Sequence, residues 1–336
     1  MPETHNDAAR RLLLEGKPIP SDLYAKVTSL DLIPDGEEDR TSLDDYSVIG
    51  RFHNLKQLFL KDTDVRDISF IKDLPELKEL HLSKSNVVDI SPLAELRNLK
   101  KFNMLHTLIE DISPLQTHEK LIFYSASGSP VSDLRPLSGC TELKFLNLMG
   151  TKVNNLEPFR HFGELNTLML TDREVDSLEP LIGLKSIENL NLAGTAAPDY
   201  SPISVLGTVK KLGLSNGPFS DTAVLQNLEL LQFINLDRSN VRHLPKLACL
   251  PNLLFLIISH TEVSDISALR DARKLESLNI SSTEVSDVNC LRNLPKLKWL
   301  AMKNTNVTSC DCVDHVPELI SDFIRPNERP GSGIIH

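Results

Sequence analysis

The sequence predicts an α/β solenoid, a fold in which short repeats stack side by side around one continuous core. Three observations support this prediction. Aliphatic residues recur with a period of 22 from Leu55 onwards. Two of them in each unit are separated by a single residue, which is the spacing of side chains on one face of a strand. Finally, 40% of the residues are hydrophobic but only 5% are aromatic, as expected for a repeating aliphatic core.

The 22-residue register holds without a slip over residues 55–318. Positions 4 and 6 of each unit are apolar or aromatic throughout, so they face the core, while positions 3, 5 and 7 face away from it. No unit can bury its apolar side alone, and neighbouring units must therefore stack. The twelve units start at Leu55, Leu77, Leu99, Leu121, Leu143, Leu165, Ile187, Val209, Leu231, Leu253, Leu275 and Leu297.

Residues 1–54 are predicted to form an N-terminal helical cap with one degenerate repeat. The segment from Asn6 to Gly16 has helical character, and Val27, Leu30 and Leu32 imitate positions 1, 4 and 6 of a unit. A solenoid needs such a cap because its first unit would otherwise expose the core. Residues 319–336 are expected to add a C-terminal cap strand and a flexible tail rich in Pro and Gly.

The unit at Leu77, LKELHLSKSNVVDISPLAELRN, resembles the 22-residue leucine-rich repeat of bacterial internalin-type proteins, whose pattern is LxxLxLxxNxIxDIxPLxxL. The resemblance extends over the twelve units. It implies a leucine-rich repeat horseshoe or arc, with a parallel β-sheet on the concave face and short 3₁₀ or turn segments on the convex face. It also implies a bacterial source. Where that pattern has Asn, this chain mostly has Thr or Ser, whose hydroxyl groups can still bond to nearby backbone groups.

The net charge and the number of cysteines argue against several classes of binding partner and several cellular locations. With 36 Lys and Arg against 46 Asp and Glu, the net charge is −10, so we expect neither a nucleic-acid nor a membrane partner. Five cysteines in a chain of this length form no disulfide framework, which favours a reducing compartment. The only apolar run near the start, Leu12 to Leu14, is too short for a signal peptide. We therefore expect a cytoplasmic protein, or one delivered to a host cell by a non-classical secretion system.

From the arrangement of the polar residues in the repeat we expect no catalytic residue, no cofactor and no metal site. Cys310, Cys312 and His315 form a CxCxxH string, but structural zinc needs four ligands in recognisable pairs. Position 13 of the unit is usually Asp, followed by an aliphatic residue and often Ser-Pro, which is typical of the start of a short helical turn. These aspartates are predicted to be scaffold: Asp67, Asp89, Asp111, Asp133, Asp199, Asp221, Asp265 and Asp287.

The outward-facing strand positions carry apolar residues that the core does not require, and this predicts a partner-binding surface on the concave face. Two alternatives stay open: the cap or the tail covers these residues, or the partner binds elsewhere, on the convex side or the ends. The predicted partner-binding residues are Phe59, Phe123, Phe145, Met149, Met169, Lys211, Phe233, Phe255, Ile257 and Trp299, with Asp237, Arg238 and His260 at the rim.

These observations favour a non-enzymatic, monomeric protein–protein interaction module. A bacterial effector and an intracellular inhibitor or adaptor both agree with the sequence. The alternative is a regulatory subunit of an enzyme such as a phosphatase, because eukaryotic regulators share the 22-residue repeat class. An enzyme with its site in residues 1–54 is disfavoured, since that segment is short and poor in Gly, Cys and His.

Overall fold

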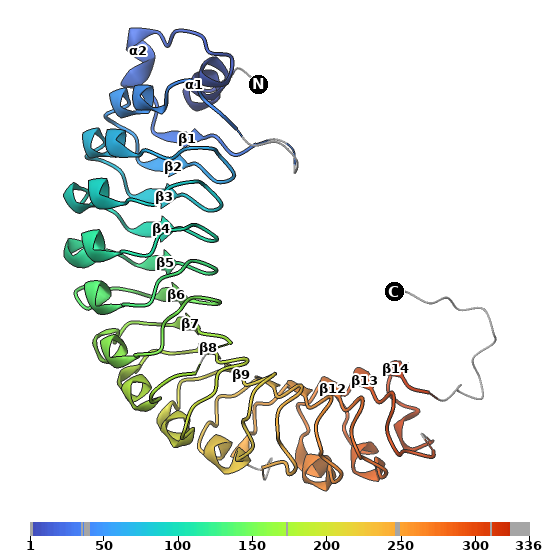
Figure 1. Ribbon diagram of the computed structural model, residues 1–336. Helices are drawn as coiled ribbons and strands as arrows, with labels where there is room; N and C mark the ends of the chain where they lie inside the picture. Colours follow the sequence, from blue (N-terminus) through green and yellow to red (C-terminus); the bar gives the residue numbers. More distant parts are fainter. Residues whose placement is uncertain are drawn as a thin grey trace. The chain divides into compact units, whose positions relative to one another are not determined.

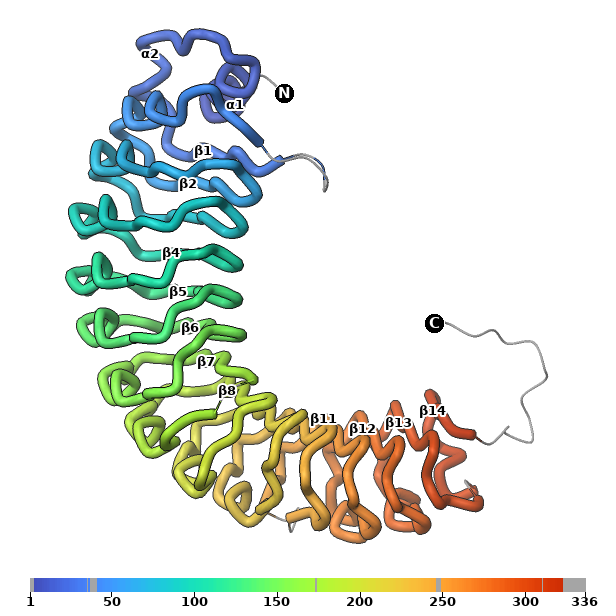
Figure 2. The backbone as a smooth tube through the Cα atoms, in the orientation of Figure 1, coloured from blue at the N-terminus to red at the C-terminus, as the bar shows by residue number. Residues whose placement is uncertain are grey.

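The computed structural model describes residues 3–34, 36, 41–172, 174–245, 249–309 and 311–322. It divides into two compact units. The first comprises residues 1–189 and 197–202, and the second comprises residues 190–196 and 203–336. Each unit is a stack of chain coils that begin with a short strand and return through a 3₁₀ turn (Figures 1 and 2).

The chain begins with two α-helices in the first unit, α1 (His5–Leu14) and α2 (Ser21–Tyr24). Thr4 caps α1 by accepting a hydrogen bond from the Asp7 backbone N–H. Helix α1 lies against the first strand: the Arg10 Nε donates to the Asp31 carbonyl at 2.8 Å, and Ala9 is fully buried. The segment with helical character in the sequence is therefore a helix packed on the edge strand.

The strands of the first unit are parallel and follow one another in chain order. From β2 onwards each residue pairs with the residue 22 positions further on, for example Leu58 with Leu80. The pairing of β1 with β2 joins Leu30 to Leu58, an offset of 28 that accommodates the longer connection of the cap. The strands are β1 (Ser29–Asp31), β2 (Gln57–Phe59), β3 (Glu79–His81), β4 (Lys101–Asn103), β5 (Phe123–Ser125), β6 (Phe145–Asn147) and β7 (Thr167–Met169).

The strands of the second unit are also parallel and follow the chain order. The last pairing joins Leu300 to Leu319, an offset of 19, so the final strand begins slightly earlier than a full repeat would. Strand β8 (Asn189–Asn191) lies at the boundary of the two units. It is followed by β9 (Lys211–Gly213), β10 (Phe233–Asn235), β11 (Phe255–Ile257), β12 (Ser277–Asn279), β13 (Trp299–Ala301) and β14 (Glu318–Ile320).

Short 3₁₀ helices close the coils on the side opposite the strands. Many begin with Ser-Pro or Glu-Pro, and proline suits the first position of a helical turn because its missing N–H would have no partner there. They are η1 (Tyr46–Arg51), η2 (Ser69–Asp73), η3 (Ser91–Glu95), η4 (Ser113–Thr117), η5 (Arg135–Leu137), η6 (Glu157–His161), η7 (Glu179–Gly183), η8 (Ser201–Val205), η9 (Thr222–Leu225), η11 (Ser267–Asp271), η12 (Asn289–Leu291) and η13 (Asp311–Val313).

The core consists of the repeating apolar columns. The residues at positions 4 and 6, such as Leu146 and Leu148, are fully buried between the strands and the 3₁₀ turns. At position 9 a buried hydroxyl bonds to a backbone carbonyl just after the strand of the same 22-residue repeat. Thr151 Oγ1, for example, donates to the Leu148 carbonyl at 2.7 Å. The predicted leucine-rich repeat solenoid, with parallel strands and short 3₁₀ segments, is confirmed.

A feature that the sequence analysis did not anticipate lies at position 8. All twelve residues there have a left-handed backbone with φ between 53° and 70°, and only three of them are glycine. This conformation turns the chain away from the strand after each position 7. For most L-residues it is unfavourable by about 1–2 kcal/mol. The non-glycine residues are Asp62, Lys84, His106, Asp172, Asn216, Arg238, His260, Ser282 and Asn304.

Candidate protein-binding face

The side of each sheet that carries positions 3, 5 and 7 is called the sheet face here. In strand β6, Phe145 and Asn147 are half-buried while Leu146 between them is fully buried. The same alternation recurs in most strands of both units. The odd-numbered side chains therefore lie outside the core, as the strand spacing predicted.

The first cluster lies in the first unit and consists of Phe123, Phe145, Met149 and Met169. Phe123 and Phe145 occupy paired positions on β5 and β6. Their rings are stacked with centroids 4.5 Å apart and planes only 5° apart. Met169 on β7 pairs with Asn147, and Met149 is 36% exposed just beyond the end of β6. The predicted residues thus lie on or just after three consecutive strands of the sheet face, and two of them are in ring contact.

The second cluster lies in the second unit and consists of Phe233, Phe255 and Ile257. Phe233 and Phe255 are paired on β10 and β11, but their ring centroids are 6.4 Å apart and their planes are inclined by 44°. Phe255 is 40% exposed. Ile257 follows on the same strand and pairs with Asn235. These rings are open to contact with another molecule.

Two further predicted residues border the second cluster. The exposed Lys211 pairs with Phe233 from the preceding strand. Trp299 lies two strands beyond Phe255, on β13, where it pairs with Ser277 and is half-buried. A cation therefore lies on the strand next to the cluster on one side, and an indole lies two strands away on the other, beyond Ser277.

The predicted rim residues of the second cluster bond to one another. The Asp237 Oδ1 lies 2.8 Å from the His260 Nδ1 and accepts a hydrogen bond from the Ser259 hydroxyl at 2.6 Å. The Arg238 Nε is 3.5 Å from the other carboxylate oxygen. Both Arg238 and His260 have the left-handed backbone of position 8. This polar group holds two basic side chains at the edge of the apolar patch.

Phe59 has polar neighbours that the apolar pattern of the sequence did not predict. Its ring lies 4.7 Å from that of His81 on the next strand. Glu79 lies beside this pair and accepts hydrogen bonds from Gln57 at 2.9 Å and Lys101 at 3.4 Å, and its Oε1 is 2.9 Å from the His81 Nε2. Burial opposes ionisation of Glu79, but these hydrogen bonds and the Lys101 charge outweigh it and hold its pKa below the ordinary value. The strand pattern gave Glu79 no role, yet it organises this part of the sheet face.

The aspartates at position 13 are scaffold, as predicted. In each case the carboxylate accepts a hydrogen bond from the backbone N–H two residues later, and this N–H begins the 3₁₀ turn. Asp89 and Ser91 show the geometry, with Oδ1 to N at 2.7 Å and the Ser91 hydroxyl donating to Oδ2 at 2.9 Å. Equivalent bonds are made by Asp67, Asp111, Asp133, Asp199, Asp221, Asp265 and Asp287.

No group of three or more His, Cys, Asp or Glu suited to a metal ion occurs within the described residues. Cys310 of the CxCxxH string lies outside them. Burial raises the pKa of the Cys140 thiol to about 12 and that of the Cys290 thiol to about 11. Both thiols are therefore protonated at neutral pH, and a protonated thiol is a weak nucleophile.

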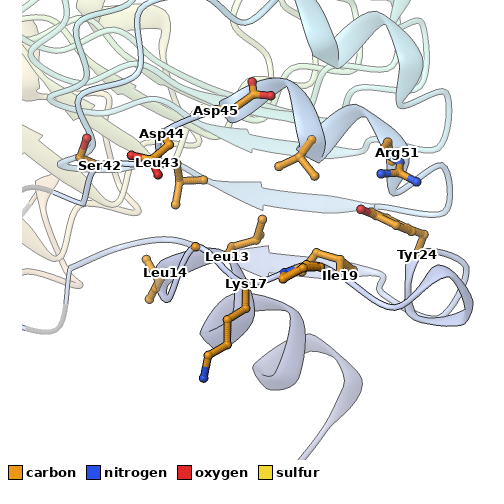
Figure 3. Close-up of a pocket in the computed structure, with 13 residues that line it drawn as sticks. Leu13, Leu14, Lys17, Ile19, Tyr24, Ser42, Leu43, Asp44, Asp45 and Arg51 are labelled. Carbon is orange, nitrogen blue, oxygen red and sulfur yellow. The ribbon is translucent and has the colours of Figure 1, made fainter.

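A pocket of about 360 Å³ lies in the N-terminal cap, between the end of α1 and the segment leading into η1 (Figure 3). Its wall includes Leu13 and Leu43, and the Arg51 guanidinium lies 4.3 Å above the Tyr24 ring at one end. Lys17 is paired with Glu15 at 2.8 Å. The two basic side chains of the pocket, Lys17 and Arg51, are thus engaged by other residues of the cap.

Comparison with known protein families matches the chain to a model of leucine-rich repeats in two copies. The two matches cover residues 53–95 and 75–117. No curated protein matches the chain. The family model thus identifies leucine-rich repeats within residues 53–117 of the first unit.

Solved structures extend the likeness over most of the chain. An internalin, InlF, from Listeria monocytogenes has a TM-score of 0.84 at 23% identity, covering 97% of this chain and 96% of the internalin. A leucine-rich repeat protein of Leptospira interrogans has a TM-score of 0.74 at 17% identity, covering 93% and 94% of the two chains. At this identity the likeness shows the fold.

A third structure shows the same fold with a ligand. The leucine-rich repeat ectodomain of the Arabidopsis thaliana receptor kinase GASSHO1/SCHENGEN3, in complex with Casparian strip integrity factor 2, has a TM-score of 0.67 at 16% identity. The likeness covers 90% of this chain and 43% of that one.

Among the described residues of our chain, no helix combines the length and apolar character needed to cross a bilayer.

Proposed function

We propose that this leucine-rich repeat protein is a non-catalytic module that binds one protein partner through the sheet face, with the second cluster at the centre of the interface. The observation that carries the proposal is the exposure of Phe255, 40% of its surface, beside a neighbouring Phe233 ring that does not stack on it. Exposed aromatic side chains inside a polar rim are typical of binding hot spots. The rim is supplied by Asp237, Arg238 and His260.

The chemistry of the polar residues supports a binding role over a catalytic one. The position-13 carboxylates are occupied in capping the 3₁₀ turns, and the buried thiols of Cys140 and Cys290 stay protonated. The leucine-rich repeat fold generally mediates protein–protein interaction. The complex formed by the Arabidopsis thaliana ectodomain supports the same use of the fold here.

The likeness to chains of Listeria and Leptospira supports our proposal for the wider role. It favours a bacterial source, and with it an effector or an intracellular inhibitor or adaptor, monomeric and either cytoplasmic or delivered to a host cell. In this proposal residues 1–54 and 319–336 are the caps, and residues 55–318 carry the sheet face. The first cluster and Phe59 extend the binding surface in the first unit, and Lys211 and Trp299 extend it in the second.

The test is affinity capture of partner proteins with two double variants of the full chain. Phe233→Ala with Phe255→Ala removes the second cluster, and these side chains lie outside the core, so the fold is retained. The matched control is Val205→Ala with Leu230→Ala, which removes two aliphatic side chains that are 60% and 44% exposed but lie away from the strands of the second unit.

We expect the aromatic variant to lose the main partner captured by the natural chain, and the control to keep it. Circular dichroism and urea unfolding establish that both variants are folded. Equal capture by the two variants contradicts the proposed interface, and loss in the control alone assigns binding to the opposite side.

A further inference from the structure

The sheet face carries a second periodicity, of 44 residues, superimposed on the 22-residue repeat. Position 5 is asparagine in every second unit from Leu99 to Leu275, and other residue types stand between. These residues are Asn103, Asn147, Asn191, Asn235 and Asn279. Three of them, Asn191, Asn235 and Asn279, lie in the second unit.

Each of these three side chains has a fixed orientation. The Oδ1 atoms of Asn191, Asn235 and Asn279 each accept a hydrogen bond of 3.0 Å from the backbone N–H two residues later. Because a backbone N–H can only donate, the atom facing it is the oxygen, and the NH₂ group lies on the other side of the amide. All three side chains are half-buried, and their NH₂ groups make no hydrogen bond with the part of the chain that the structure describes.

The two strands between those of the asparagines carry, at the same position, one residue without a side chain and one aliphatic residue. Gly213 lies between Asn191 and Asn235, and Ile257 lies between Asn235 and Asn279. A Cβ atom on Gly213 would lie 2.6 Å from the Asn191 Oδ1, so only glycine allows that amide its position. The aromatic residues Phe233 and Phe255 stand two positions earlier on their strands and form a parallel apolar row.

The spacing of the donors selects one backbone conformation. Neighbouring strands lie about 4.8 Å apart, so asparagines two strands apart are separated by about 9.6 Å. A polyproline II helix has three residues per turn and rises about 3.1 Å per residue, so equivalent carbonyl groups recur every 9.3 Å or so. Its carbonyl groups also lack internal hydrogen bonds and are free to accept.

The other regular conformations do not match this spacing. In an extended strand, groups on one side recur every two residues, at about 6.6 Å and 13 Å. In an α-helix the carbonyl groups are already bonded within the helix, apart from the last turn.

We propose that the sheet face of the second unit binds a proline-rich segment of a protein partner in the polyproline II conformation, lying across the strands. The amide groups of Asn191, Asn235 and Asn279 donate to every third backbone carbonyl of the segment. Apolar side chains of the segment pack on Phe233 and Phe255, since proline-rich ligands dock on aromatic surfaces. This proposal rests on the proposed function and names the class of partner for the same face.

The experiment is selection of a display library of unconstrained 16-residue peptides on the full chain. We expect enriched peptides with a three-residue periodicity and frequent proline. The first test variant is Asn191→Asp with Asn235→Asp and Asn279→Asp, which keeps each Oδ1 acceptor but removes the three NH₂ donors. Affinity for an enriched peptide should fall by about tenfold or more, since each lost hydrogen bond contributes about a factor of two to ten.

The control adds the same three negative charges on the other side of the coils. Asn155→Asp, Ser177→Asp and Ser309→Asp fall at position 13, where the native side chains already accept from the backbone N–H two residues on and where most units have Asp. This control should bind the peptide as the natural chain does. An equal loss in the control would mean that charge alone is responsible, and this would overturn the proposal.

Two further outcomes also count against the proposal. Enriched peptides with a period of 2 or 3.6 would show a strand or a helix as the ligand, and an absence of enrichment would mean that no linear segment is recognised. The proposed function fails separately, if the Phe233→Ala and Phe255→Ala variant still captures the natural partner. Loss of capture in that variant, with full retention in the triple Asn→Asp variant, would keep the interface and reject the polyproline II ligand.

Discussion

The two aromatic clusters have their phenylalanine pairs at the same position of the 22-residue repeat but differ in what the rings contact. Phe123 and Phe145 stand at position 3 of neighbouring strands, as do Phe233 and Phe255, with identical strand register. In the first cluster the rings stack at 4.5 Å and cover each other, whereas in the second they are inclined and 6.4 Å apart. Paired aromatic residues on a sheet therefore do not by themselves define a binding site, because stacking decides how much ring surface is left for a partner.

The residues at position 8 beside the two clusters also differ in type. Gly128 and Gly150 follow the strands of the first cluster, and a left-handed backbone suits glycine. Arg238 and His260 follow the strands of the second cluster with the same backbone, which is unfavourable for residues with a Cβ. The second cluster therefore has two basic side chains at position 8 where the first cluster has none.

We expect the largest effect on stability from substitutions in the core beneath the clusters, where the two clusters do not differ. Leu146 lies under the first cluster and Leu256 under the second, and both are buried. Either Leu→Ala substitution should lower the free energy of unfolding by about 2–5 kcal/mol through the cavity it leaves. Urea unfolding measures this, and a loss below 1 kcal/mol or so at either site would mean that the repeat core is not continuous there.

Binding should separate the clusters most clearly. Replacing Phe233 and Phe255 by Ala should weaken partner binding by about 2 kcal/mol or more, roughly 30-fold, as for central hot-spot residues. The same change at Phe123 and Phe145 should weaken it less, because the stacked rings present less surface. Titration calorimetry with the captured partner compares them, and the reverse order would move the centre of the interface to the first cluster.

The coupling energy between the two rings should be larger in the first cluster, the reverse of the order expected for partner binding. A double-mutant cycle on Phe123 and Phe145 should give a coupling energy of about 0.5–1.5 kcal/mol in the free protein. For Phe233 and Phe255 we expect a smaller value, since their rings do not stack. Equal coupling in urea unfolding would remove the distinction between stacked and open rings.

Glycine at position 8 should stabilise the second cluster and impair its binding. Arg238→Gly and His260→Gly relieve the left-handed strain and should each raise the free energy of unfolding by up to about 1 kcal/mol. Partner affinity should fall, because the rim loses its basic groups. Gly150→Ala is the matched control and should lower stability by a similar amount, since its φ is 65°. Unchanged affinity in both Gly variants would deny the rim a role in binding.

The smallest effect at neutral pH concerns His118, which lies in a column that is mostly leucine. Its ring is fully buried, and neither ring nitrogen has a partner of good geometry in the part of the chain that is described. Burial lowers the pKa of His118 more than the nearby Leu115 and Leu93 carbonyl groups raise it. The unfolded chain binds this proton below about pH 6.5, so stability is present above that pH and is lost as the pH falls towards the lower folded pKa.

The column offers its own comparison, because the equivalent residue in the second unit is Leu228 or Leu250. His118→Leu should flatten the decline of stability below pH 6.5, as measured by urea unfolding at several pH values. A decline of the same steepness in His118→Leu would assign the acid sensitivity to other groups.

The strands β2 to β13 were predictable from the sequence because the period of 22 does not slip between them, so Leu55 alone fixes their positions, whereas β14 begins three residues earlier than this period gives. The outward direction of Phe145 and Phe255 followed from the alternation of side chains along a strand. The sequence could not distinguish stacked from inclined rings, since both pairs are Phe at position 3 and the difference arises from side-chain packing.

Other features escaped the analysis for identifiable reasons. Lys84 and Arg238 have no preference for a left-handed backbone, so the turn at position 8 is indicated only by its glycine, asparagine, aspartate and histidine members. The asparagine row is present in the sequence, but its period of 44 is not part of the 22-residue pattern. The role of Glu79 depends on polar contacts between neighbouring strands, which the apolar pattern does not predict.

Oxidative footprinting of the protein, alone and in complex with its captured partner, tests directly whether the partner binds the sheet face. We expect Phe255, Ile257 and Trp299 to become protected from labelling in the complex, while Val205 and Leu230 are labelled as before. Persistent labelling of Phe255, together with protection of Val205 or Leu230, would contradict it.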